Sequence, residues 1–259
     1  MIRVKNLTFS YKKDSKFIEN LNLNIKKGTI TTIIGPNGSG KSTLLSILCG
    51  LNKPGSGQVL INNKKINEIK CKELAKEIAT VHQQNTIPGD ITIEELVAYG
   101  RIPHKNYFDP LNEEDRKVID WAMKSMELYE FRNKSVMNLS GGERQRGFIA
   151  MALAQKSPIL FLDEPTTYLD IHHQVEILEM IKYLNEINGI TVVMVLHDIN
   201  QAIKYSDNIV VMQNGEIVAN GKTKEVINID LLKKVYQVDG YLNKCEETKE
   251  IYFIPKKIS

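Results

Sequence analysis

The stretch that decides the fold is Gly35-Pro36-Asn37-Gly38-Ser39-Gly40-Lys41-Ser42, which matches the pattern G-x-x-x-x-G-K-[ST]. The β-branched, apolar segment 29–34 precedes it, and the segment 41–50, with leucine and isoleucine at helical spacing, follows it. A glycine-rich turn between a buried strand and a helix is the context in which this pattern binds phosphate. The sequence therefore predicts a phosphate-binding loop at the start of a helix.

The chemistry of this loop follows from its residue types. Glycines let backbone N–H groups approach phosphate oxygens, and the helix N-terminus adds a positive dipole. Lys41 is placed for the β- and γ-phosphates of ATP, and the hydroxyl of Ser42 for Mg²⁺. The other loop residues expected to bind the nucleotide are Asn37, Gly38, Ser39, Gly40 and Thr43. The alternative, a plain glycine-rich turn with a solvent-exposed lysine, does not explain why strand and helix flank the loop.

An acidic pair follows a second buried strand. The segment 159–162 is apolar and leads directly into Asp163 and Glu164. Because ligands bind at the carboxyl ends of strands in open α/β sheets, Asp163 is expected to help hold Mg²⁺. A carboxylate at Glu164 can polarise the attacking water. Strands often end in acidic turns, so the pair gains its weight from occurring together with the loop.

The rest of the chain alternates between strand and helix patterns. Predicted strands cover 58–61, 78–81, 191–196 and 208–212, and predicted helices cover 113–130 and 174–188. This alternation indicates an α/β fold with a largely parallel sheet. The stretch 93–155 has few strand signals and is expected to be mostly helical. Residues 221–259 form a short tail whose sequence indicates no chemistry.

Composition narrows the functional class. The 259 residues carry 34 basic and 31 acidic side chains, a net charge of +3, and this balance argues against a nucleic-acid partner. The three cysteines form no C-x-x-C pair, which fits a reducing cytosol. The sequence has no expected signal peptide and no apolar run near the ~18–20 residues of a membrane helix. Any membrane role then needs a partner that supplies the membrane part.

The segment Leu139-Ser140-Gly141-Gly142-Glu143-Arg144-Gln145-Arg146 resembles the signature sequence of ABC ATPases. Two glycines after a serine, at the start of an apolar helix, make an anion-binding helix N-terminus, and Ser140 also suits an N-cap. The resemblance covers nearly the whole chain, from about residue 3 to at least 221. It implies a single ABC-type P-loop ATPase domain over 1–259, with a RecA-like parallel-sheet core, an antiparallel β lobe and a helical lobe.

The resemblance also implies boundaries and residue roles. Residues 1–90 and 156–220 would form the core and β lobe, 91–155 the helical lobe with the signature, and 221–259 the tail. Tyr11 falls where an aromatic side chain stacks on adenine, although a half-buried strand tyrosine is the alternative. Gln83 falls at the glutamine that senses Mg²⁺ or water, with the adjacent Gln84 leaving the register open.

Two more positions match the family pattern. Asp170 lies in the segment that crosses the dimer interface, and His197 follows a predicted strand where the family has a histidine bonded to the γ-phosphate. In this family Ser140, Gly141 and Gly142 of one subunit contact the γ-phosphate held by the other. The implied partners are a second ATPase subunit, membrane permease subunits near the Gln83–Arg101 region and, indirectly, a substrate-binding protein. The implied location is the cytoplasmic face of the cell membrane.

A narrower resemblance points to the cargo. The segments 98–104 (AYGRIPH) and 167–174 (TYLDIHHQ) are similar to the ATPases of importers for iron–siderophore complexes, haem and vitamin B12. His82 departs from this pattern, since those importers often have proline there. His172 and His173 suggest a metal site, but adjacent residues on a helix do not share a face, so none is expected.

Other functions stay open beside a metal-chelate importer. One is an importer ATPase for another cargo, such as amino acids, phosphate or cobalt. A non-transport ABC ATPase would usually carry two cassettes or a long coiled-coil insertion, and an exporter usually has its membrane part fused. An inactive binding module would lack Lys41 or Glu164, and both are present.

Overall fold

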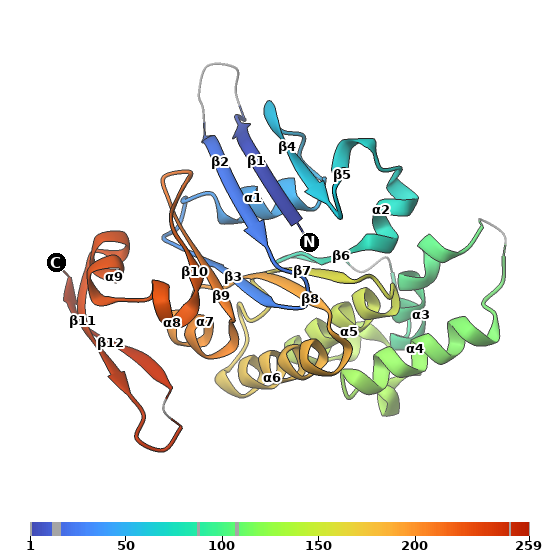
Figure 1. The fold of residues 1–259 in the computed structure, drawn as a ribbon. Coiled ribbons are helices and arrows are strands. Elements are labelled where there is room, and N and C mark those ends of the chain that lie inside the picture. The colour runs from blue at the N-terminus through green and yellow to red at the C-terminus, as the bar shows by residue number, and fades with distance from the viewer. Residues whose placement is uncertain (1, 12–16, 87–88, 107–108, 249, 259) are drawn as a thin grey trace. The chain divides into compact units, whose positions relative to one another are not determined.

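The chain forms two compact units in the computed structural model (Figure 1). Unit 1 comprises residues 1–68 and 193–259, and unit 2 comprises residues 69–192. The structure describes residues 2–11, 17–86, 89–106, 109–248 and 250–258. The boundaries expected from the sequence at 90, 155 and 220 stay predictions.

An antiparallel sheet of order β2-β1-β4-β5 occupies part of unit 1. Its strands are β1 (Ile2–Phe9), β2 (Ile18–Ile25), β4 (Ser56–Ile61) and β5 (Lys64–Lys65), followed by the 3-10 turn η1 (Ile66–Glu68). Ile2, Val4, Leu7 and Phe9 of β1 are buried, while most residues between them are exposed or partly exposed. This one-sided burial confirms the antiparallel β lobe that the family resemblance implies.

The strand that precedes the phosphate loop lies elsewhere in unit 1. β3 (Ile30–Ile34) pairs in parallel with β9 (Asn208–Gln213), and β10 (Glu216–Lys222) pairs antiparallel with β9. All five residues of β3 are buried, as expected for a strand of a parallel sheet that is covered on both faces. The predicted strand 29–34 and the helix that follows, α1 (Lys41–Leu48), are thereby confirmed.

The tail, residues 221–259, has more structure than the sequence indicated. It forms α8 (Thr223–Val226), α9 (Ile229–Tyr236) and a hairpin of β11 (Val238–Lys244) with β12 (Ile251–Ile258). The hairpin is fastened to α7 (Ile199–Tyr205): the Asn200 side chain donates to the Phe253 carbonyl at 3.1 Å and accepts from the Phe253 N–H at 2.7 Å. The side chain of Phe253 is buried, so the tail packs as part of unit 1.

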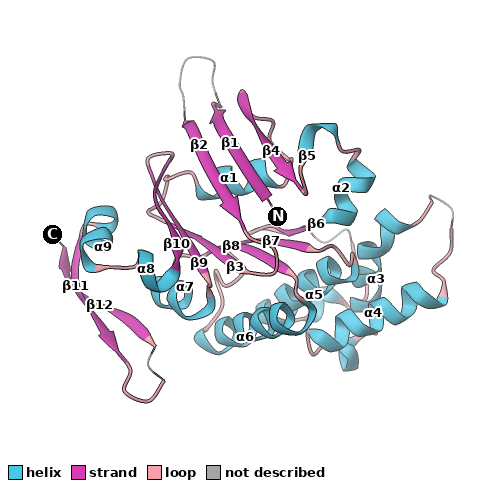
Figure 2. Ribbon diagram, viewed as in Figure 1, coloured by secondary structure: helices cyan, strands magenta, loops and turns pink. Residues whose placement is uncertain are grey.

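Unit 2 contains two parallel strands and most of the helices. β6 (Ile78–Val81) pairs in parallel with β7 (Ile159–Asp163), and β8 (Thr191–Val195) runs across the unit boundary. Between β6 and β7 the structure contains helices only, apart from one isolated bridge, in the residues that it describes (Figure 2). The helices of this unit are α2 (Cys71–Glu77), α3 (Ile93–Ala98), η2 (Tyr99–His104), α4 (Glu113–Ser125), η3 (Tyr129–Phe131), η4 (Val136–Asn138), α5 (Gly141–Ala154) and α6 (Ile171–Asn188).

Two helix boundaries differ from the sequence expectation. α4 ends at Ser125 rather than 130, because Glu127 adopts the left-handed conformation (φ 52°) that a helix cannot continue through. α6 begins at Ile171, three residues early, because Asp170 caps it. No helix in the described part of the chain is long and apolar enough to cross a membrane.

Candidate active site

The phosphate loop of unit 1 leads into α1, and no side chain of the described residues caps the start of this helix. Gly40 is the N-cap of α1 with φ 101°, and Gly38 has φ 77°, conformations that a residue with a Cβ adopts at a cost. The first-turn N–H groups of a helix have no partner within it. With no side-chain cap at Gly40, the start of α1 suits an anion.

Two side chains in this loop fit a phosphate group. Lys41 is 5% exposed, and its ammonium donates to the carbonyls of Gly35 and Pro36, each at 3.0 Å. These bonds hold the cation against the loop backbone. The Ser39 hydroxyl is buried and has no hydrogen-bond partner among the residues that the structure describes. A native structure rarely tolerates such a group unless a ligand or water completes its hydrogen bonding. Both observations agree with nucleotide binding at this loop.

Tyr11 lies beside the same helix. It follows β1 and is 64% exposed, so it is not the half-buried strand tyrosine of the alternative interpretation. Its hydroxyl is 2.7 Å from Oγ1 of Thr43, and its ring packs edge-on against Phe9 with centroids 4.9 Å apart. An exposed aromatic ring anchored to the first turn of α1 suits stacking on a base.

Glu164 and Gln83 meet in unit 2. Glu164 directly follows the last residue of β7, Asp163, and the Gln83 side-chain amide donates to its Oε2 at 2.6 Å. Thr167 also donates to Oε2, at 3.1 Å. The two donors fix the orientation of the carboxylate, as a group that polarises a water requires. The contact involves Gln83 itself, which supports the register expected for it.

The backbone at Glu164 is unusual. Its φ of 52° lies in the left-handed region, which residues other than glycine, asparagine and aspartate seldom occupy. Such conformations cost about 1–3 kcal/mol and cluster at functional sites. The conformation turns the chain sharply after β7, and the Thr167 N–H closes the turn on the Glu164 carbonyl at 3.2 Å.

The signature segment of unit 2 begins α5, as its pattern indicates. Ser140 is the N-cap: its hydroxyl accepts from the Glu143 N–H at 3.2 Å, and the Glu143 carboxylate accepts from the Ser140 N–H at 2.7 Å. This reciprocal capping box confirms the predicted N-cap. The hydrogen bond from the Ser140 backbone lowers the pKa of Glu143, against the opposing effect of burial.

Glu143→Gln should make folding stability less dependent on pH. Because the pKa of Glu143 is lowered in the folded protein, its contribution is present above the ordinary pKa of 4.5 and is lost as pH falls through the folded value. A carboxylate at a helix N-terminus contributes about 0.3–1 kcal/mol, so we expect a melting temperature about 1–3 °C lower at pH 7 and little difference near pH 3. Thermal unfolding followed by circular dichroism at both pH values measures this. A constant difference across pH would contradict it.

The remaining predicted residues occupy element ends. Asp170 caps α6 by accepting from the His173 N–H at 3.0 Å, and this backbone hydrogen bond lowers the pKa of the Asp170 carboxyl. His197 is exposed in unit 1, between β8 and α7. Ser42, in the first turn of α1, is also exposed. Each side chain can therefore be reached by a ligand in its own unit.

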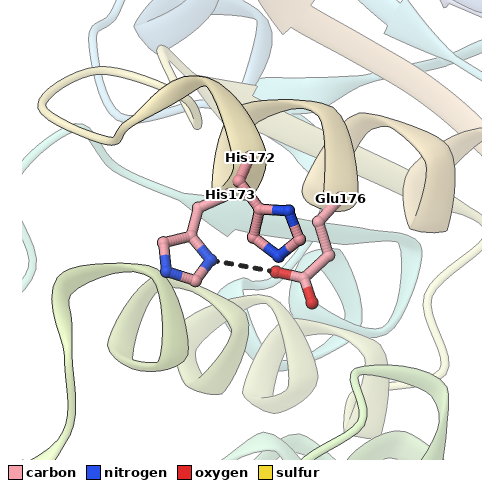
Figure 3. Close-up of side chains that lie close together, drawn as sticks. All are labelled: His172, His173 and Glu176. Atoms are coloured by element: carbon pink, nitrogen blue, oxygen red, sulfur yellow. Dashed lines mark hydrogen bonds and ion pairs between the residues drawn. The ribbon is translucent and has the colours of Figure 1, made fainter.

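His172, His173 and Glu176 converge on one turn of α6 (Figure 3). Their ligand atoms lie within 4.8 Å of one another, although helix geometry alone did not suggest that neighbouring histidines share a face. Two features oppose a cation there. The Arg146 guanidinium already pairs with Glu176, and the start of α6 carries the positive end of the helix dipole. We assign no metal to this cluster, and the expectation of none stays a prediction.

Comparison with known proteins decides the family. The sequence profile of the family described as "ABC transporter" matches residues 18–167. The chain belongs to the ABC transporter family. Within it the chain is an ATP-hydrolysing cassette, in agreement with its phosphate loop and signature segment.

Relatives of this ABC cassette include import proteins. It is 44% identical over 227 residues to the iron(3+)-hydroxamate import ATP-binding protein FhuC of Bacillus subtilis, covering 88% of this chain and 84% of the relative. It is 44% identical over 235 residues to the ferric enterobactin transport ATP-binding protein FepC of Escherichia coli (91% and 86%). It is 40% identical over 259 residues to the petrobactin import ATP-binding protein FpuC of Bacillus anthracis (100% and 94%).

Solved structures agree with the fold of this ABC cassette. A transporter described as of the metal-chelate type, in an inward-facing conformation, has a TM-score of 0.85 at 27% identity, covering 98% of this chain and 96% of that one. A dimeric ATP-binding cassette bound to ADP and phosphate, MJ0796, has a TM-score of 0.74 at 40% identity (86% and 99%).

Sequence reasoning missed several contacts of the site. Thr43 and Tyr11 were each expected to bind the nucleotide, but their mutual contact was not foreseen, nor were the contacts of Thr167 with Glu164 and of Arg146 with Glu176. The Thr43–Tyr11 and Arg146–Glu176 pairs join residues about thirty positions apart, which local patterns do not connect. Thr167 is only three residues from Glu164, but its role depends on the left-handed turn that brings it back.

Proposed function

We propose that this ABC cassette is the ATPase subunit of a binding-protein-dependent importer for iron–siderophore or related metal chelates. The names of relatives with 40–44% identity over most of the chain support this cargo class. The observation that carries the ATPase activity is the uncapped start of α1 with the buried Lys41 and the unpartnered Ser39 hydroxyl. An importer for another cargo is the second candidate.

In the proposed mechanism, unit 1 holds the nucleotide. The loop Asn37–Thr43 binds the phosphates, Tyr11 stacks on the adenine, and His197 bonds to the γ-phosphate. Glu164 polarises the attacking water, and the Gln83 side-chain amide, which donates to its carboxylate at 2.6 Å, orients it. Mg²⁺ would be held by Ser42, Asp163 and Gln83, and it would neutralise phosphate charge.

A second copy of the chain completes the reaction. Ser140, Gly141 and Gly142 at the start of α5 would contact the γ-phosphate held by the other subunit, with Asp170 at the subunit interface. ATP then stabilises the closed dimer, and hydrolysis allows it to open. This difference in affinity between closed and open states is what drives the membrane partner.

The permease is proposed to dock in a groove of unit 2. The groove has a volume of about 960 Å³. Most of the residues that line it are apolar and come from α2, α3, η2 and positions 91 and 111, with charged residues among them. Tyr99 and Ile102 are 40% and 63% exposed at this groove. An amphipathic helix of the permease matches an apolar groove with charged residues in its lining. The cassette would thereby be held at the cytoplasmic face of the membrane.

Ile102→Asp should weaken the complex with the permease by at least about tenfold, because an apolar anchor at the centre of an interface contributes most of its binding energy. ATP hydrolysis by the isolated cassette should not change. Ile187→Asp is the matched control, since Ile187 is 66% exposed on α6 outside the groove. Titration of each variant with detergent-solubilised permease measures the dissociation constant of the complex. Equal weakening by the two substitutions would contradict docking at the groove.

Transport itself tests the cargo. The chain is purified with its permease, reconstituted in liposomes, and supplied with the cognate binding protein and radiolabelled ferric hydroxamate, haem or cobalamin. We expect uptake of one chelate class that requires ATP and Mg²⁺ and that Lys41→Ala abolishes. Uptake of phosphate or an amino acid instead would replace the proposed cargo with the second candidate.

A further inference from the structure

Gly142, in the signature segment, faces the ring of a histidine from another helix. A Cβ placed on Gly142 would lie 2.6 Å from Cγ of His173, closer than real Cβ contacts. Gly142 is the second residue of α5, so its helical backbone would accept other residues. Position 142 therefore has no space for a side chain, because the His173 ring fills that space.

His173 is itself held by a carboxylate of its own helix. Its Nδ1 lies 3.1 Å from Oε2 of Glu176 (Figure 3). The other Glu176 oxygen pairs with the Arg146 guanidinium. The Arg146 side chain is 7% exposed, so this charge pair is largely shielded from water. Gly142 and Arg146 lie four residues apart on α5, and His173 and Glu176 lie three apart on α6. The two helices are thus joined at two successive turns.

The chain just before α6 is tied to the same point. Asp170 accepts from the His173 N–H at 3.0 Å, and the Gln174 side chain donates to the Leu169 carbonyl at 2.9 Å. The Leu169 side chain lies 3.6 Å from where a Cβ of Gly141 would be. The segment Leu169–Asp170 and the first turn of α5 therefore share one packed contact surface.

We propose that His173 is a positioning residue that sets the first turn of α5 relative to the segment Leu169–Asp170. This inference rests on the proposed function, in which both elements meet the other subunit when ATP closes the dimer. When the relative position of these two elements is fixed, both can contact the other subunit at the same time. Without the ring, the first turn of α5 could shift relative to the segment Leu169–Asp170. Closing the dimer would then also cost the free energy of ordering these two elements again.

Four variants in a Glu164→Gln background test this. His173→Ala removes the ring, and His173→Asn keeps a nitrogen near the position of Nδ1. Gly142→Ala introduces the clash, and Gly142→Ala with His173→Ala removes its cause. His172→Ala is the matched control, because this adjacent histidine is exposed and is not among the atoms nearest to Gly142. Light scattering with ATP·Mg²⁺ gives the dimer dissociation constant, and a fluorescent ATP analogue gives nucleotide affinity.

We expect His173→Ala to raise the dimer dissociation constant about tenfold, the size of effect found for contacting residues in one network. Its nucleotide affinity should not change, and His172→Ala should keep the dimer dissociation constant of the parent. His173→Asn should recover part of the loss. The double variant should dimerise better than Gly142→Ala alone. Equal dimerisation of His173→Ala and its parent, or purely additive losses in the double variant, would overturn the inference.

The outcome separates the inference from the proposed function. If the parent Glu164→Gln does not dimerise with ATP even when the permease is added, the proposed sandwich fails. The turnover of the same His173 and Gly142 variants is then measured with Glu164 restored. A lower kcat at unchanged KM, recovered in the double variant, supports the positioning role. Turnover equal to wild type for His173→Ala would overturn it. Thermal unfolding of each variant identifies any loss that comes from unfolding alone.

Discussion

Glu164→Gln will lower ATP hydrolysis by about 10²–10⁴-fold, the range for loss of a general base, while ATP binding stays close to the wild-type value. The carboxylate accepts hydrogen bonds from Gln83 at 2.6 Å and Thr167 at 3.1 Å. The amide oxygen of glutamine can accept the same two bonds, so the geometry is kept while the ability to polarise water is lost. ATP should then accumulate a dimer that cannot open by hydrolysis.

Phosphate release and size-exclusion chromatography with light scattering measure the two halves of this prediction. Glu186→Gln, at an exposed position on α6, is the charge-matched control and should behave as wild type. Unchanged hydrolysis would remove Glu164 from the proposed mechanism. Loss of hydrolysis with ATP bound to a monomer would show that closure requires the permease, and adding the permease would then produce the dimer.

Lys41→Ala will abolish most nucleotide binding and hydrolysis together. The Lys41 ammonium is buried and is held by two loop carbonyls at 3.0 Å, so its charge is positioned before a phosphate arrives. Hydrogen bonds to charged groups contribute about 1.5–3 kcal/mol, which corresponds to about 10–150-fold in affinity. Hydrolysis should fall by a further factor of about 10²–10³, because the same charge meets the developing transition state.

The thermal shift produced by ATP is a direct measure of this loss, since stabilisation by a ligand depends on its concentration relative to Kd. Lys26→Ala, at an exposed lysine of unit 1, is the control. Lys41→Met keeps the volume without the charge and separates a packing effect from an electrostatic one. An ATP-induced shift of wild-type size in Lys41→Ala would exclude Lys41 from nucleotide binding.

Local patterns predicted the parts of the fold whose signals are contiguous in sequence. The five buried residues of β3, the glycine loop and α1 follow from composition and periodicity over about twenty positions. The start of α6 was missed although Asp170 is a standard N-cap, because no glutamate follows three residues later to complete a capping box. The hairpin of β11 and β12 was missed because neither strand shows a regular alternation of apolar and polar residues: Asp239, Gly240, Asn243 and Lys244 interrupt β11, and β12 continues from an apolar run into Pro255, Lys256 and Lys257.

Contacts between distant residues could not be predicted in the same way. Gln83 and Glu164 lie 81 positions apart, and only the family resemblance suggested that both serve one reaction. The packing of His173 against Gly142 has no signal in either local segment. It depends on how α5 packs against α6, and hydrophobic periodicity within one segment does not determine that packing.

The groove beside Tyr99 and Ile102 shares no residue with the nucleotide-binding and water-polarising sets. After gene duplication, one copy can accumulate substitutions in this groove without a direct change to the residues that bind and hydrolyse ATP. With the permease docked at this groove as proposed, selection for a new permease acts on a surface separate from the residues that bind and hydrolyse ATP. A genome can in this way equip several uptake systems with cassettes that keep one hydrolytic chemistry while each recognises its own membrane protein.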